Sequence, residues 1–94
     1  MIIIVAKNII KEGKLEEFKA MAKELVNASR KEPGCISYCL NQDLNNKAVL
    51  TFIEEWENKE AIELHNNSAH FTRIVPKLGE FAEKASEVNL YERV

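Results

Sequence analysis

The spacing of the apolar residues changes repeatedly along this chain, and the order of the changes restricts the folds that it can adopt. Apolar residues alternate with the period of a β-strand over residues 2–10, 35–41, 48–56 and 87–93. They recur with the helical period over about 17 residues from Leu15, and again in two pieces, residues 58–66 and 68–82. The predicted order is therefore β-α-β-β-α-β, with the second helix broken.

This order is typical of the ferredoxin-like α+β fold, a split β-α-β arrangement in which an antiparallel sheet carries its helices on one face. Residues 1–94 are enough for a single domain of this kind and leave no room for a second. The first strand is apolar on both sides, and the third places either Val49 and Ile53 or Leu50 and Phe52 on the face that lacks helices. Because a monomer would leave much of this surface in water, we expect a homodimer formed through the sheets.

Helix-stopping and turn-forming residues mark the element boundaries. Pro33-Gly34 should end the first helix, and the Asn- and Asp-rich residues 43–47 should turn the hairpin. Asn58 and Ser68 are the expected N-caps of the two later helical pieces. A kink or break is expected at Pro76 and Gly79. In the last strand, the residues expected to face inward are Val88 and Leu90.

The charge pattern argues against a nucleic-acid partner. The chain has 13 basic and 15 acidic residues, and lysines stand next to glutamates, as in Lys31-Glu32 and Lys59-Glu60, which is typical of a mixed, solvated surface. The apolar start, residues 1–6, stops at Lys7 and is too short for a signal-peptide core or a membrane span. We therefore expect a cytoplasmic protein with no membrane association.

The two cysteines, Cys35 and Cys39, fall on one predicted strand, on the face opposite Ile36, Tyr38 and Leu40. Four residues of strand separate them by about 13 Å, whereas a disulfide requires Cα atoms within about 7 Å. We expect both to be buried free thiols.

Asn8 and the two histidines are the polar residues that could perform chemistry. Asn8 shares a strand face with Ile4 and Ile10, so its amide is expected to point into the core. It could donate hydrogen bonds to a substrate oxygen or to developing negative charge, or it could be structural and pair with a strand end or loop. His65, near the end of the short helix, and His70 could act as acid or base, or could cap helix carbonyls or be exposed.

The end of the third strand is a second candidate region. Trp56 could form a wall of an aromatic pocket together with Phe52, although a single tryptophan is more often a core residue. The alternation leaves open whether Glu54 or Glu55 faces the pocket, but Glu54 shares the face of Phe52 and Trp56. We predict no metal site, because the two histidines lack a third ligand, and no phosphate-binding glycine loop.

The region from Glu54 to Phe71 follows the pattern E-x-W-x₄-A-x₃-H-x₂-S-x-H-F, with Pro33-Gly34-Cys35 and Asn8 ahead of it. With these residues the chain resembles the antibiotic biosynthesis monooxygenase family over nearly its whole length. That resemblance implies a dimeric ferredoxin-like domain. The family includes cofactor-independent oxygenases of quinols and polyketide aromatics, an isomerase of a phosphorylated autoinducer breakdown product, and haem-degrading enzymes.

The resemblance narrows the function without deciding it. The haem-degrading members ligate iron with a histidine at the position of Val75, which cannot serve as a ligand, so this branch is disfavoured. The leading hypothesis is a cofactor-free monooxygenase that acts on a small aromatic quinol or phenol and O₂. We assign His65 as base, Asn8 as oxyanion stabiliser, and Trp56, Phe52, His70 and Glu54 to substrate binding. The alternatives are the isomerase and a non-catalytic module that binds a small ligand.

Overall fold

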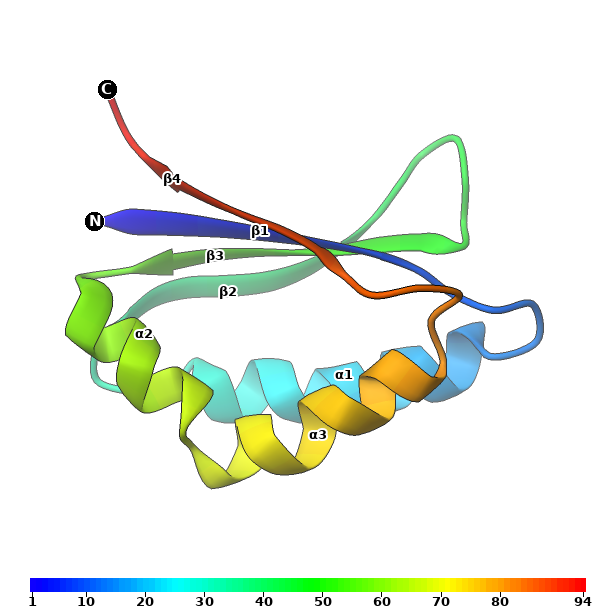
Figure 1. The fold of residues 1–94 in the computed structure, drawn as a ribbon, viewed down its shortest axis with the longest axis horizontal. Helices are drawn as coiled ribbons and strands as arrows, with labels where there is room; N and C mark the ends of the chain where they lie inside the picture. Colours follow the sequence, from blue (N-terminus) through cyan, green and yellow to red (C-terminus); the bar gives the residue numbers. More distant parts are fainter.

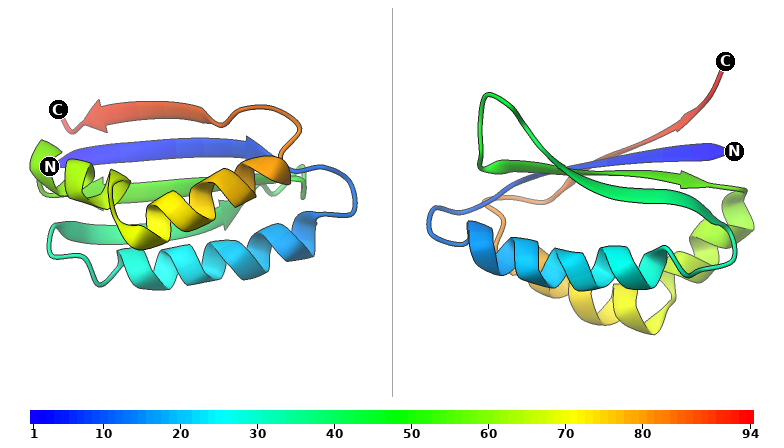
Figure 2. Two further views of the ribbon diagram at one scale, coloured as in Figure 1. Left: turned by 60° about the horizontal axis from the view of Figure 1, so that its bottom comes forward. Right: turned by 180° about the vertical axis from the view of Figure 1, so that it is seen from behind.

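The computed structural model describes residues 1–94 and contains four strands and three helices. In chain order these are β1 (Ile2–Ile9), α1 (Leu15–Ser29), β2 (Cys35–Gln42), β3 (Val49–Trp56), α2 (Lys59–Asn66), α3 (Ala69–Glu80) and β4 (Glu87–Glu92). The strands form one antiparallel sheet in the order β2-β3-β1-β4, and the three helices lie on one of its faces (Figures 1 and 2). This arrangement confirms the predicted ferredoxin-like α+β fold.

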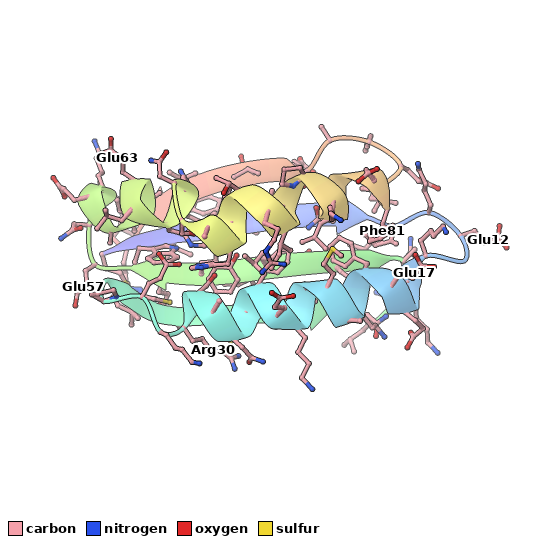
Figure 3. The ribbon with its side chains drawn as sticks, turned by 90° about the horizontal axis from the view of Figure 1, so that it is seen from below. Glu12, Glu17, Arg30, Glu57, Glu63 and Phe81 are labelled. Carbon is pink, nitrogen blue, oxygen red and sulfur yellow. The ribbon has the colours of Figure 1, made fainter.

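The core lies between the sheet and the helix layer. Helices α1 and α3 run side by side across the sheet (Figure 3) and bury their apolar stripes against it, with α1 lying over β2 and its Phe18 ring packing near that of Phe52 on β3. Because β1 and β3 are paired in the centre of the sheet, their inward side chains are covered most completely. The fully buried side chains include Phe18, Leu25, Leu50, Trp56 and Ile74.

Capping side chains explain why the second helical region is divided where the sequence indicates. The Asn58 side chain accepts the backbone N–H of Ala61 at 2.9 Å and starts α2, and Ser68 Oγ accepts the N–H of Phe71 at 3.2 Å and starts α3. Each cap satisfies a backbone donor that has no partner inside the helix. The division at Asn67–Ser68 changes the chain direction between His65 and His70.

Of the kink or break expected at Pro76 and Gly79, the break is wrong, because α3 is one continuous helix from Ala69 to Glu80. Proline removes the hydrogen bond to the carbonyl four residues earlier, here that of Thr72. Both Thr72 and Pro76 are on the exposed side of the helix, where water can satisfy the freed carbonyl.

The strict alternation expected for β2 is also wrong at its start. An irregularity between Cys35 and Ser37 turns Cys35 inward opposite Trp56 and leaves Ile36 exposed. The extra residue of a β-bulge changes which side chains share a face. Both cysteines are free, but the expected burial is wrong: Cys39 is exposed and Cys35 is half-buried.

The edge strand β4 is not covered by the helix layer. Val88 and Leu90 lie on the helix side of the sheet, as expected from the sequence, but they are 53% and 58% exposed because no helix passes over them (Figure 2). None of the three helices combines the length and apolar character that crossing a membrane requires.

Two glycine substitutions should have opposite effects on stability. A Cβ atom at Gly34 would lie 2.2 Å from the Cβ of Ala61 in α2, so Gly34→Ala should lower the free energy of unfolding by about 1–3 kcal/mol. A Cβ at Gly79 in α3 meets nothing within 4 Å, so Gly79→Ala should raise it by up to about 1 kcal/mol. Urea unfolding measures both values; equal effects of the two substitutions would contradict the close packing of Gly34 on α2.

Candidate active site

His65 is the most deeply buried ionisable residue in the helix layer. It is 1% exposed, and its ring lies 4.5 Å from that of Trp56 and 5.0 Å from that of Phe71, measured between ring centroids. The position near the end of α2 points the imidazole inward between the helices and the sheet. The aromatic neighbours therefore fix the ring in one orientation.

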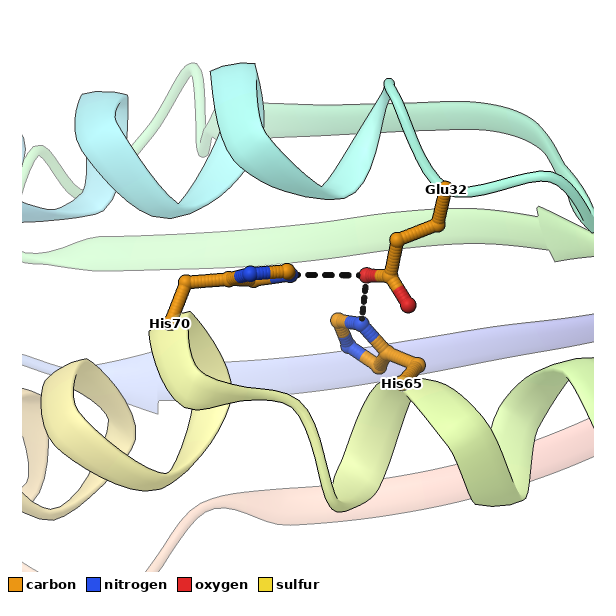
Figure 4. A group of neighbouring side chains, drawn as sticks. All are labelled: Glu32, His65 and His70. Atoms are coloured by element: carbon orange, nitrogen blue, oxygen red, sulfur yellow. Dashed lines mark hydrogen bonds and ion pairs between the residues drawn. The ribbon is translucent and has the colours of Figure 1, made fainter.

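Glu32, in the loop that follows α1, binds both histidines through one carboxylate oxygen (Figure 4). Its Oε2 lies 2.6 Å from His65 Nδ1 and 2.8 Å from His70 Nε2. An ionised carboxylate only accepts hydrogen bonds, so each ring directs an N–H at Glu32. In the neutral imidazole of His65 the proton is therefore on Nδ1, and Nε2 carries a free lone pair. His65 Nε2 is buried and has no hydrogen-bond partner.

Burial sets the protonation state of His65. Removal from water lowers the pKa of the imidazole below its usual value, and this effect outweighs the opposing hydrogen bond and charge of Glu32. The ring is consequently neutral near pH 7, with Nε2 available as a proton acceptor.

Glu54 is a buried acid on β3 and answers the question that the sequence left open. Its side chain points into the core at 5% exposure, whereas Glu55 points to the other face and accepts a hydrogen bond from Ser37 Oγ at 2.8 Å. Burial raises the pKa of Glu54 to about 7, although Trp56 Nε1 donates to its Oε1 at 2.9 Å and thereby lowers it. Glu54 thus exists in both protonation states near neutral pH.

An apolar cavity of about 550 Å³ brings several of these residues together. It lies between the sheet and α2–α3, and it extends to the uncovered residues of β4. Eleven of the 17 residues that line it are hydrophobic, and none is lysine or arginine. Four residues predicted from the sequence contribute to the wall, namely Asn8, Phe52, Glu54 and His65.

Trp56 and His70 lie behind the cavity wall. Trp56 contacts the His65 ring and holds Glu54, and His70 reaches the site through Glu32 and through its ring, whose centroid lies 6.1 Å from that of His65. Neither residue lines the cavity itself, but both contact His65, which does. The chemical roles assigned to the individual site residues from the sequence remain predictions.

The amide of Asn8 is occupied by the protein itself. Its Nδ2 donates to the carbonyls of Ala6 and Leu50, both at 3.2 Å, and its Oδ1 accepts a hydrogen bond from the hydroxyl of Ser86. Of the two interpretations of Asn8, these contacts favour the structural one, because both N–H groups are already used. Asn8 fixes Ser86, which also lines the cavity.

Glu32 and Tyr38 were not identified from the sequence. In the sequence, Glu32 stands among alternating charges that are typical of a solvated surface. The expectation that the two histidines lack a third ligand group is wrong, since the ligating atoms of Glu32, His65 and His70 all lie within 4.8 Å of one another. No signal in the residues around Glu32 indicates these contacts, because the histidines lie 33 and 38 residues further along the chain. Tyr38 lines the cavity beside His65, with ring centroids 5.4 Å apart.

The fold and the site together define the class of protein: a small α+β domain with a buried histidine–carboxylate pair at an apolar cavity. The family model described as antibiotic biosynthesis monooxygenase matches residues 1–77. The chain belongs to this family, which confirms the resemblance noted in the sequence.

Individual relatives agree with this assignment. "Uncharacterized protein sll1783" of Synechocystis is 36% identical over 91 residues, which cover 96% of this chain and 62% of that protein, so the chain spans under two thirds of its length. "Putative monooxygenase YcnE" of Bacillus subtilis is 35% identical over 77 residues, covering 82% of this chain and 81% of the relative. A crystal structure described as an antibiotic biosynthesis monooxygenase is 32% identical with a TM-score of 0.95, covering 100% of this chain and 99% of that one.

Replacing Glu54 should change how stability depends on pH. Because its folded-state pKa is raised from 4.5 to about 7, the folded state holds a proton that the unfolded state releases, so stability falls as pH rises through this window. Glu54→Gln keeps an acceptor for Trp56 but has no charge to bury. Relative to wild type, it should gain about 3 kcal/mol between about pH 4.5 and about pH 8.

Chemical denaturation across this pH range measures the difference. Glu63→Gln, on the exposed side of α2, is the matched control and should follow the wild-type profile. A stability difference between Glu54→Gln and wild type that is constant with pH would show that Glu54 ionises as freely in the folded state as in the unfolded one.

Proposed function

We propose that the protein catalyses the O₂-dependent oxidation of a small phenolic or quinol substrate without a metal or organic cofactor, with His65 as the base. The observation that carries this proposal is the bare, buried Nε2 of His65, in a ring whose Nδ1 donates to Glu32, at the wall of an apolar cavity. The family and the Bacillus subtilis relative support a monooxygenase-like function in general terms.

The mechanism begins with proton transfer. Nε2 accepts the proton of the substrate hydroxyl, and the resulting imidazolium is stabilised by Glu32, which already accepts the Nδ1–H at 2.6 Å. Glu32 thereby performs the task that the acid performs in a catalytic triad: it sets the tautomer and balances the charge that forms. The apolar surroundings make the phenolate a stronger electron donor because water cannot stabilise it.

The substrate itself supplies the electrons in the second stage. The phenolate gives an electron to O₂, the two radicals combine into a carbon-bound peroxide, and loss of water leaves a carbonyl. The balance is one phenol plus one O₂ giving one quinone plus one water. Glu54, which carries a proton for part of the time near neutral pH, is the group that lines the cavity and can protonate the departing oxygen.

The other hypotheses fit the cavity less well. A phosphorylated isomerase substrate would bring a dianion into a cavity with no lysine or arginine in its wall and two carboxyl groups near it. The hypothesis of a non-catalytic binding module would be favoured if side chains filled the site and left no room for a reaction. The space between His65 and β4 is open instead.

Oxygen uptake with a dihydroxynaphthalene tests the proposal. His65→Ala should lower kcat at least about 100-fold, because general-base catalysis contributes that much or more. Leu64→Ala, one residue away on the exposed side of α2, is the control for α2 itself and should retain the wild-type rate. Equal rates for wild type and His65→Ala would exclude His65 as the base, and consumption of a phosphorylated dicarbonyl without O₂ would favour the isomerase.

The sheet face that carries no helices supports a second proposal, that the chain forms a homodimer through this face. Ile53 of β3 and Tyr91 of β4 are large side chains exposed on it, alongside the half-buried Ile3 and Val5 of β1. Pairing this face with a copy of itself would remove a contiguous apolar surface from water.

Ile53→Lys should convert the dimer into a monomer, because it would bury a charged side chain without a partner in each half of an apolar interface. Light scattering coupled to gel filtration measures the mass. Leu44→Lys, in the exposed hairpin turn, is the control and should remain dimeric. A wild-type mass equal to one chain at every concentration tested would contradict the proposed dimer.

A further inference from the structure

The three side chains around Glu32 Oε2 form a set of donors that the proposed oxidation does not require in full. Oxidation needs the contact with His65, yet His70 also converges on the same oxygen from another helix (Figure 4). The three ligand atoms, Glu32 Oε2, His65 Nδ1 and His70 Nε2, lie within 4.8 Å of one another.

The donor set and the geometry suit a divalent transition metal. Two imidazole nitrogens and one carboxylate oxygen are ligands that Zn²⁺ and its neighbours prefer, at about 2.0–2.2 Å from the ion. Atoms bound tetrahedrally at that distance are about 3.3–3.6 Å apart, so the present separations of 2.6 and 2.8 Å need to widen by about 0.5–1 Å.

The three ligands differ in how they are held. Glu32 lies in the loop between α1 and β2, and His70 lies in the first turn of α3, with its side chain 19% exposed. His65, in contrast, is held by Trp56 and Phe71 and provides a fixed ligand. Solvent on the His70 side can supply the remaining coordination position.

The charge of the cluster also favours a cation. With both imidazoles neutral, the group carries the single negative charge of Glu32, which is largely buried and makes no ion pair with a lysine or arginine. A buried charge without a countercharge is costly, and a bound cation would neutralise it.

We propose that Glu32, His65 and His70 form a binding site for a divalent transition-metal ion of the Zn²⁺ type. Binding replaces the two hydrogen bonds at Glu32 with bonds to the metal. Each neutral imidazole then ligates through the nitrogen that now faces Glu32 and carries its proton on the other one.

Metal binding has a consequence for the cavity, and this consequence rests on the proposed function. With the metal on Nδ1, the proton of His65 is on Nε2, which changes from a hydrogen-bond acceptor to a donor. His65 can then no longer act as a base, although its ring carries the same number of protons as before. An occupied site would accordingly inhibit the oxidation.

Titration of the metal-free protein with Co²⁺ tests the site directly. The protein should lack an affinity tag and carry Cys35→Ser and Cys39→Ser so that no thiol competes for the metal. We expect visible Co²⁺ absorption that saturates at one equivalent and is displaced by Zn²⁺. His70→Ala and Glu32→Gln should each weaken binding at least about tenfold, the smallest loss typical even of an outer-shell partner. Glu63→Gln should bind like the parent protein.

A second readout does not depend on the variants. Bound Co²⁺ should shift proton resonances of two imidazole rings in the otherwise wild-type chain, those of His65 and His70. Absence of Co²⁺ absorption, or equal affinity in His70→Ala, would overturn the site.

Inhibition is measured separately, as the loss of oxygen uptake when Zn²⁺ is added to wild type. Undiminished uptake at saturating Zn²⁺ would contradict the tautomer exchange. If no phenol is oxidised at all, the proposed function fails while the Co²⁺ titration still decides the metal site.

Discussion

The organisation of the site depends on one carboxylate oxygen. Glu32 Oε2 accepts hydrogen bonds from His65 on α2 and His70 on α3, and so it ties the loop after α1 to both pieces of the divided helix. Hydrogen bonds to charged groups contribute about 1.5–3 kcal/mol each. More important for function, this oxygen determines which nitrogen of His65 carries the proton, and therefore leaves Nε2 as a bare acceptor in a buried position.

The incomplete helix layer complements this arrangement. The helix layer covers β1, β2 and β3 but leaves β4 open, so a cavity remains between His65, Glu54 and the apolar side chains of the edge strand. Burial affects the ionisation of His65 and Glu54 at the cavity in opposite ways. Burial lowers the pKa of His65 and raises that of Glu54, which makes both neutral forms accessible near pH 7. A neutral base and a neutral acid that line one apolar cavity can transfer protons without the free-energy cost of first burying a charge.

Local patterns were sufficient to predict much of the fold. The period of the apolar residues located all the elements, and Asn58 and Ser68 were recognisable as caps because capping requires only neighbouring residues. The inward direction of Asn8 followed from strand alternation in the same way. Errors arose where the outcome depended on distant parts of the chain. The bulge at Cys35–Ser37 is set by pairing with β3, and the exposure of Val88 and Leu90 depends on where helices far along the chain are placed. Glu32 is 33 residues from His65, and no local pattern reveals that contact.

The central claim is that Glu32 holds metal-free His65 as a neutral imidazole with its proton on Nδ1. Long-range proton–nitrogen NMR of the two ring nitrogens of His65, near neutral pH, measures this state most directly. We expect a protonated Nδ1 and an unprotonated Nε2, with the proton position lost or exchanged in Glu32→Ala. A proton on Nε2, or two protonated ring nitrogens in the wild-type protein, would contradict it.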